Sequence, residues 1–273
     1  MTPSLLRQLL PILALTLITS SGTLADTVPI HTVTTTKFTV EDAEVSKAFY
    51  EDLLGIPELR RYVDEGRLVE PFMGWVEDGR IGLLDYSEKE TLKKSSAPVS
   101  AISVPDLEEL AARFESAGKQ FPIYDLGGGT RISIVNDPSG NTIEIVEVEG
   151  PAAVTGARLI VEDRAAAEEW FLEVFDVELD GGIVPGGRIV TDNFDEVFLK
   201  MGGGLFFALY EPMDEPPLPK SNYPVVAIYS TDYDGVLERI KALGLYVRER
   251  GDGLLFARDP SGNVVEVVRQ TAR

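Results

Sequence analysis

Several residue types that often carry chemistry are missing from this 273-residue sequence. It contains no cysteine, which excludes disulfides, thiolate catalysis, zinc–thiolate sites and a lipid-modified N-terminal cysteine. Its only histidine is His31, which we expect to lie in the N-terminal tail of the mature chain. A Ser-His-Asp catalytic set is excluded on that expectation.

Basic residues are also scarce. The chain has 25 Lys and Arg against 45 Asp and Glu, giving a net charge of −20 and a pI near 4.4. An acidic surface repels nucleic acid and anionic lipid, so we expect neither as a partner. The charge is compatible with cationic ligands, although a merely solvated surface is the simpler interpretation.

Long apolar runs are absent beyond the N-terminus. Leu9–Ile18 follows Arg7, is interrupted by Pro11, and is shorter than the ~18 residues of a membrane span. Thr23-Leu24-Ala25 then offers small residues at a plausible cleavage site. We therefore predict a signal peptide over residues 1–25, a periplasmic or secreted protein, and no membrane association after cleavage. A retained N-terminal anchor is the alternative.

A turn sequence occurs twice in the chain. Asp137-Pro138-Ser139-Gly140-Asn141 recurs as Asp259-Pro260-Ser261-Gly262-Asn263, each between an apolar and an alternating segment. Proline presets φ and glycine accepts positive φ, so each copy predicts a tight β-hairpin.

Helical segments repeat in the same register. Asp42 and Asp163 are good N-caps for helices that contain the aromatic pairs Phe49-Tyr50 and Trp170-Phe171. A second strand and helix follow in each half, near residues 99–118 and 225–244. We therefore predict two similar halves, 33–149 and 151–271, each made of two strand–helix–strands modules.

This pattern resembles the vicinal oxygen chelate superfamily, which holds glyoxalases, bleomycin-resistance proteins and extradiol dioxygenases. The resemblance implies an α+β fold of two tandem units, each with two βαβββ modules. Their curved mixed sheets would form cups, with the helices on the convex face.

The resemblance also implies positions for metal ligands. The first-strand positions, usually His or Gln in the family, are Thr35, Val99, Gly156 and Val225 here. The acidic positions after the repeated turns are Glu144 and Glu266, and Asp85 or Glu211 stand near the remaining ones. No effective first-strand ligand is left, so we predict no metal and no cofactor.

Strand alternation places Thr35, Lys37, Arg158, Glu144 and Glu266 on the cup faces. We interpret Lys37–Glu144 and Arg158–Glu266 as ion pairs that replace a metal, because an unpaired charge in a cup is costly. The alternative is that these side chains reach the mouths of the cups and are solvated. Tyr229 either lines a cup or belongs to the core.

Three functions remain open. The first is metal-independent binding of a small molecule, as in bleomycin-resistance proteins, where the net charge favours a cation but Lys37 and Arg158 favour a carboxylate. The second is a lyase, isomerase or dioxygenase with an oxygen-only metal site built on Glu144 and Glu266. The third is a structural module whose cups are filled by side chains. Since two paired units share one chain, we predict a monomer that contains an internal pseudo-dimer.

Overall fold

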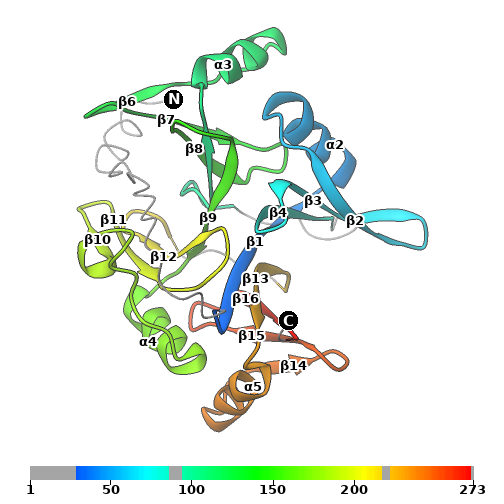
Figure 1. Cartoon of the computed structure of the whole chain (residues 1–273), viewed down its shortest axis with the longest axis vertical. Helices are drawn as coiled ribbons and strands as arrows, with labels where there is room; N and C mark the ends of the chain where they lie inside the picture. The colour runs from blue at the N-terminus through cyan, green and yellow to red at the C-terminus, as the bar shows by residue number, and fades with distance from the viewer. Residues whose placement is uncertain (1–28, 86–93, 217–221, 272–273) are drawn as a thin grey trace.

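The computed structural model describes residues 29–85, 94–216 and 222–271 (Figure 1). The signal peptide predicted over residues 1–25 lies outside the described residues. Within the described ranges, no helix is both long enough and apolar enough to span a bilayer.

Four modules follow one another along the chain, and each contains a strand, a helix and three further strands. The first module comprises β1 (His31–Val40), α2 (Ala43–Ala48) with the π-helical turn η1 (Phe49–Leu53), β2 (Glu58–Asp64), β3 (Arg67–Val76) and β4 (Gly79–Asp85). The second comprises β5 (Ser100–Val104), α3 (Leu107–Ser116), β6 (Tyr124–Gly127), β7 (Thr130–Asn136) and β8 (Thr142–Glu147). The third comprises β9 (Ala153–Ile160), α4 (Arg164–Phe175), the 3-10 turn η2 (Pro185–Gly187), β10 (Arg188–Val190), β11 (Phe194–Leu199) and β12 (Phe206–Pro212). The fourth comprises β13 (Pro224–Ser230), α5 (Tyr233–Ala242), β14 (Val247–Glu249), β15 (Leu254–Arg258) and β16 (Val264–Arg269).

The strands form two eight-stranded mixed sheets, which confirms the predicted fold class. Sheet A has the order β14-β15-β16-β13-β1-β4-β3-β2, and sheet B has the order β10-β11-β12-β9-β5-β8-β7-β6. Sheet A therefore joins the first module to the fourth, and sheet B joins the second to the third. The halves 33–149 and 151–271 do not each close a sheet of their own, and this crosswise pairing decides which side chains meet in the cups.

The helix ends follow the capping residues seen in the sequence. Asp42 accepts a hydrogen bond from the Val45 amide at 3.0 Å, and Asp163 accepts one from the Ala166 amide at 2.9 Å. Gly55 and Asp176 stand just beyond the two helical segments with φ of 70° and 52°, the left-handed conformation that ends a helix. Both aromatic pairs thus face the sheets from short, capped helices.

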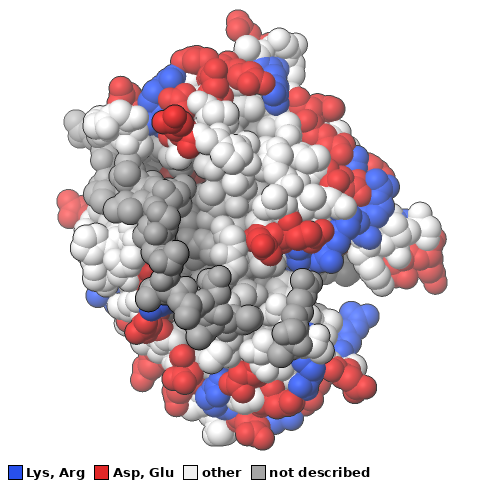
Figure 2. Space-filling model, in the orientation of Figure 1, with Lys and Arg blue, Asp and Glu red and all other residues white. Residues whose placement is uncertain are grey.

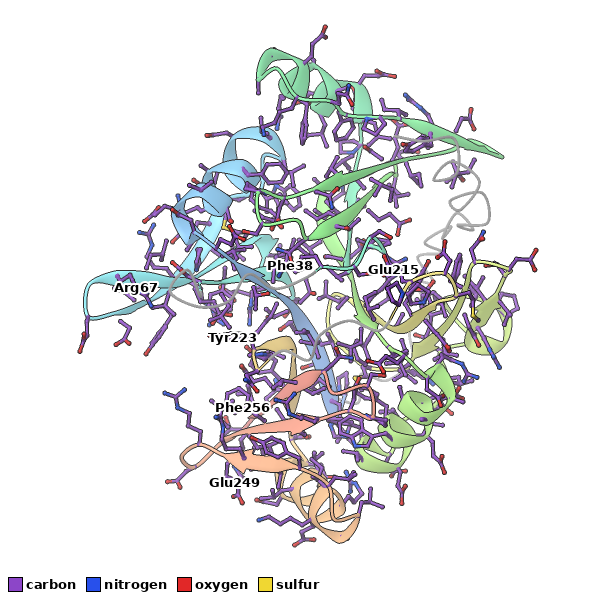
Figure 3. The ribbon with its side chains drawn as sticks, turned by 180° about the vertical axis from the view of Figure 1, so that it is seen from behind. Phe38, Arg67, Glu215, Tyr223, Glu249 and Phe256 are labelled. Carbon is purple, nitrogen blue, oxygen red and sulfur yellow. The ribbon has the colours of Figure 1, made fainter. Side chains whose placement is uncertain are left out.

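One hydrophobic cluster extends through both sheets and all four helices. Alternate residues of the first strand in every module are buried in it, such as Phe38 and Val40 in β1 and Ala157 and Leu159 in β9. Seen from behind, Phe38 lies near the middle of the molecule (Figure 3). The opposite faces of the same strands are concave, and these are the two cups.

The repeated turns fasten neighbouring modules together. Asn141 donates from its side chain to the Thr39 carbonyl at 3.2 Å, and Asn263 donates to the Ile160 carbonyl at 3.1 Å. Ser139 and Ser261 accept from the backbone amides of Glu41 and Glu162. Each turn therefore docks on the end of the first strand in the preceding module, while the sheets join the modules crosswise. The four modules close a ring of contacts.

Candidate functional site

A buried ammonium lies between two carboxylates in the cup of sheet A. Lys37 on β1 donates to Glu266 on β16 at 2.9 Å, and its Nζ lies 3.0 Å from Glu70 Oε1 on β3. The Lys37 side chain is only 6% exposed. The positive charge of Lys37 is thus neutralised by Glu70 from the first module and Glu266 from the last.

The cup of sheet B contains the matching arrangement. Arg158 on β9 donates from Nε to Glu196 on β11 at 2.7 Å, and its Nη1 lies 2.8 Å from Glu144 Oε2 on β8. These three side chains are between 4% and 7% exposed. Both cups therefore hold one cation and two carboxylates, which we call the sheet A triad and the sheet B triad.

The two triads occupy equivalent positions. Lys37 is paired in register with Gly82, as Arg158 is with Ala208, and Glu266 and Glu144 lie beside Ala227 and Ala101. The predicted pairs Lys37–Glu144 and Arg158–Glu266 are wrong, because the sheets combine modules from opposite halves. In each triad, one of the two acids comes from the cation's own half of the chain and the other, Glu266 or Glu144, comes from the opposite half.

Burial controls the electrostatics of both triads. It opposes the charged form of Lys37, but Glu266 and Glu70 outweigh this effect and raise the pKa of the ammonium. Burial raises the pKa of Glu70 and of Glu196, and the neighbouring cation only partly offsets the rise. The Lys37 and Arg158 side chains are only 6% and 7% exposed, which excludes the alternative in which they are solvated. In each triad, therefore, one carboxyl has a raised pKa: Glu70 in sheet A and Glu196 in sheet B.

These residues do not fit the divalent metal that the family fold implies. The positions of the first-strand ligands are occupied by Thr35 and Gly156, and the remaining acids already bind an ammonium or a guanidinium. A metal ion there would lie against a buried positive charge. Among the described residues, no three His, Asp or Glu side chains are grouped so that they could hold an ion.

An aromatic ring fills the space beside Gly156, the first-strand ligand position on β9 in the cup of sheet B. Gly156 is paired in register with Phe206, and a Cβ at Gly156 would overlap the Phe206 ring. The same ring lies 5.1 Å from the Arg158 guanidinium and packs edge-on against Phe198. Phe206 thus plugs this cup directly over its triad.

The cup of sheet A has a polar hollow at the corresponding place. Arg80 stands in register with Thr35, as Phe206 does with Gly156, and it donates to the Tyr229 hydroxyl at 2.9 Å. Arg60, Arg80 and Tyr229 line a cavity of about 640 Å³. Tyr229 is therefore at a cavity, whereas Thr35 is fully buried beside Thr34 and is not among the residues that line it.

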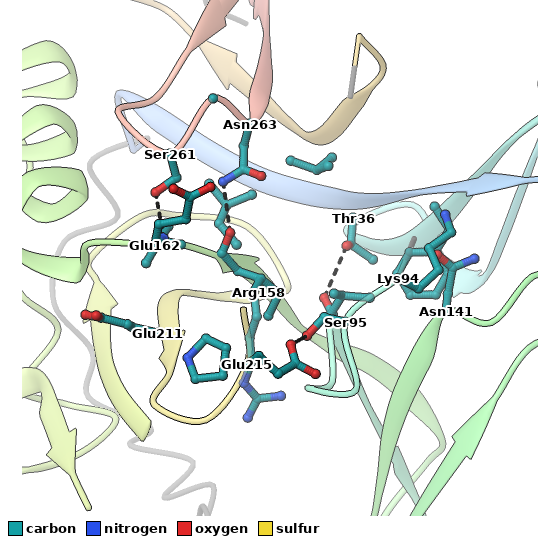
Figure 4. A pocket seen from close by; sticks show the side chains of 18 of the residues that line it. Thr36, Lys94, Ser95, Asn141, Arg158, Glu162, Glu211, Glu215, Ser261 and Asn263 are labelled. Carbon is teal, nitrogen blue, oxygen red and sulfur yellow. Dashed lines mark hydrogen bonds between the residues drawn. The ribbon is translucent and has the colours of Figure 1, made fainter. Parts of the chain in front are cut away.

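A second cavity, of about 320 Å³, lies where β1 and β9 end between the two sheets (Figure 4). Lys94 borders it and donates to the Thr39 carbonyl at 2.8 Å. Burial lowers the pKa of Lys94 to about 8. Glu215 crosses the cavity mouth and accepts from the Ser95 hydroxyl at 2.7 Å.

One further sequence expectation is wrong. His31 does not lie in a tail: it is the first residue of β1, only 5% exposed, and packs edge-on against Phe175 of α4. Burial lowers its pKa, so it is a core histidine on the helix side of sheet A. Glu211, which the sequence leaves open as an acid near a remaining ligand position, accepts from the Arg164 amide at the start of α4 and borders the second cavity.

Sequence reasoning missed the second acid of each triad and the arginines of the hollow. Glu70 and Glu196 lie on the third strands of their modules, whose register the sequence does not define. Charged residues inside a mostly apolar strand, as Asp195 and Glu196 are in β11, were the available signal. Arg60 and Arg80 lie on strands that carry no repeated landmark.

Comparisons with known proteins agree with this architecture. Residues 30–145 match the model of the Glyoxalase/Bleomycin resistance protein/Dioxygenase superfamily. Glyoxalase I from Zea mays superposes with a TM-score of 0.68 at 21% identity, over 88% of this chain and 92% of that one. A putative dioxygenase from Bacillus subtilis gives 0.62 at 15% identity, over 89% and 86%. No curated protein matches the sequence significantly.

These identities are low, so the solved structures establish the fold alone. The family match covers the first two modules, and the two crosswise sheets repeat the same module design through the rest of the chain. The first two modules therefore belong to the Glyoxalase/Bleomycin resistance protein/Dioxygenase superfamily, and the whole chain has the fold of that superfamily.

Proposed function

We propose that this protein binds a small molecule without a metal. One observation carries the proposal: in both cups, a buried cation held by two carboxylates stands where the family fold places a metal. Removing one partner of such a buried pair costs about 3–5 kcal/mol, so the acids are not free to leave the cation for a metal.

The hollow in the cup of sheet A is the proposed binding site. Its volume of about 640 Å³ falls within the ~300–1,000 Å³ typical of small-molecule sites. Phe206 fills the cup of sheet B over its triad, and the second cavity, which Lys37 and Arg158 both border, has a volume of only about 320 Å³. The hollow of sheet A is therefore the larger candidate. A hollow of this size also argues against a purely structural module.

The proposal includes export and a monomeric state. The apolar segment before residue 25 supports a cleaved signal peptide and a periplasmic or secreted location. The crosswise sheets support a monomer, because one chain supplies both modules of each cup. N-terminal sequencing of protein recovered from cell fractions, and its mass by light scattering, test these two points. An intact N-terminus in the cytoplasmic fraction, or twice the chain mass, contradicts them.

Elemental analysis combined with a thermal-shift screen tests the function. We expect purified protein to contain no stoichiometric zinc, nickel, iron or manganese, and chelation to leave its melting temperature unchanged. A ligand that binds the native state raises that temperature by mass action. Stoichiometric metal whose removal by a chelator abolishes ligand binding would refute the proposal, and would favour the metal-dependent enzyme instead.

A further inference from the structure

The hollow in sheet A presents hydrogen-bond donors on a partly apolar wall. Arg60, Arg80 and Tyr229 line it together with Val268 and Pro29. We propose that this hollow binds a small organic monocarboxylate, gripped between the guanidinium groups of Arg60 and Arg80. This inference rests on the proposed function, and it names the class of ligand.

Arg80 is held by several hydrogen bonds, but one of its N–H groups has no acceptor. It is 5% exposed, its Nη1 donates to the Glu77 carbonyl at 2.6 Å and to the Glu77 carboxylate, and its Nη2 donates to Tyr229. Its buried Nε has no hydrogen-bond partner among the described residues. A buried donor without a partner destabilises the protein, and a ligand acceptor that reached this nitrogen would offset that destabilisation.

Arg60 supplies the second guanidinium. It is exposed, stacks on the Phe72 ring at 4.6 Å, and has no carboxylate partner within the described part of the chain. The Arg80 guanidinium lies 5.6 Å from the same ring, so both cations contact Phe72. Planar guanidinium groups fixed in this way bind carboxylates better than flexible ammonium groups do.

The acids around the hollow limit the negative charge that a ligand can carry. Lys37, Arg60 and Arg80 are opposed by Glu70, Glu77 and Glu266, and Asp78 adds a further negative charge at the rim. Arg269 also lines the hollow, but it is paired with Asp234. A multiply charged anion would be repelled by Asp78 and the two acids of the triad. Acidic side chains are spread over this face of the molecule, with a band of basic side chains leading to the β2–β3 hairpin (Figure 2).

Tyr229 adds an orienting donor. Its hydroxyl accepts from Arg80, which leaves its own proton free to donate to a ligand oxygen. The apolar wall of Val268 and Pro29 suits the hydrocarbon part of the ligand. A cationic ligand would meet two guanidinium groups here, so the conflict between cation and carboxylate raised by the sequence is resolved in favour of the acid.

Matched compounds test the inference. We would titrate the full-length protein with 3-phenylpropanoate, 3-phenylpropylamine, 3-phenylpropan-1-ol, their butyl analogues and inorganic phosphate, following backbone amide NMR shifts. We expect the acids alone to bind, and Arg60→Gln to weaken them at least tenfold. Arg61→Gln is the control, because Arg61 is the next residue, exposed, and paired with Glu58 on the other face of β2. It should bind the acids as the parent protein does.

The outcomes separate this inference from the proposed function. Amines binding as tightly as acids, acids binding equally to Arg60→Gln, or no binding by any acid at millimolar concentration would overturn the carboxylate site. Metal-independent binding of an amine would still support a binding protein. A stoichiometric metal required for binding would refute the proposed function, whichever compound binds.

Discussion

Lys37 and Glu266 are 229 positions apart in the sequence, yet Lys37 Nζ lies 2.9 Å from Glu266 Oε2. This bond joins the first module to the last across the centre of sheet A. The equivalent bond in sheet B joins Arg158 to Glu144, on adjacent modules from opposite halves. The ionic centres of the cups are therefore also the places where the two halves of the chain are held together.

Replacing Lys37 by alanine should destabilise the protein by about 3–5 kcal/mol, because two buried carboxylates lose their counter-ion. Urea unfolding followed by circular dichroism measures the change. Lys241→Ala is the matched control, since the Lys241 and Glu249 side chains pair while about half exposed, and exposed pairs contribute about 0–1 kcal/mol. Equal losses in the two variants would show that the sheet A triad is solvated.

Double variants distinguish the observed ion pairs from the pairs that the sequence suggested. Arg158→Ala and Glu196→Ala should be strongly non-additive, with an interaction of about 1–3 kcal/mol, because their side chains share a buried bond. Arg158→Ala and Glu266→Ala should simply add, since these residues belong to different cups. The reverse pattern in urea unfolding would mean that each half of the chain closes its own cup.

Local signals predict much of the fold. The turn at Asp137–Asn141, its copy at Asp259–Asn263 and the caps Asp42 and Asp163 all depend on residues close in sequence, and each stands where expected. Alternation also places Lys37 and Arg158 correctly on the concave faces. These features depend on φ/ψ preferences and on the two-residue period of a strand.

Local sequence signals do not predict which acid pairs with which cation. Whether Glu266 faces Lys37 or Arg158 depends on which modules share a sheet, and both arrangements bury the same apolar faces. The contact between Gly156 and Phe206 cannot be predicted from the sequence either, because the two residues become neighbours only through the register of β9 and β12. His31 shows the same limit, since only the fold reveals that a strand begins there.

Gly156→Ala should destabilise the protein by about 1–3 kcal/mol, because the new methyl group overlaps the Phe206 ring in a packed cup. Adding Phe206→Leu should recover part of the loss by freeing that space. Thermal unfolding measures both effects. Gly181→Ala is the control: its nearest neighbour would lie 4.0 Å from the added Cβ, so it should be nearly neutral. A Gly156→Ala variant as stable as the Gly181→Ala variant would show that Phe206 does not plug the cup.

Glu196 should make the protein more stable as the pH falls from 7 to 5. Burial raises its pKa above the ordinary glutamate value of about 4.3, so the native state takes up a proton before the unfolded chain does. Between those two pKa values, the native state binds more protons, and stability rises as pH falls. Glu196→Gln resembles the protonated form and cannot gain this increment. The free energy of unfolding of the parent protein, relative to Glu196→Gln, should therefore be higher at pH 5 than at pH 7.

An exposed glutamate provides the control for this titration. Glu178 pairs with Lys200 on the surface, and the hydrogen bond from Lys200 lowers the pKa of its carboxyl. The contribution of Glu178 to stability is lost only when the pH falls below the ordinary glutamate pKa. The difference in free energy of unfolding between the parent protein and Glu178→Gln should therefore not change between pH 7 and pH 5. If Glu196→Gln and Glu178→Gln follow the same pH dependence, the acid beside Arg158 ionises like a surface carboxylate. The sheet B triad would then be open to water, and its two carboxylates would be available to bind a metal after all.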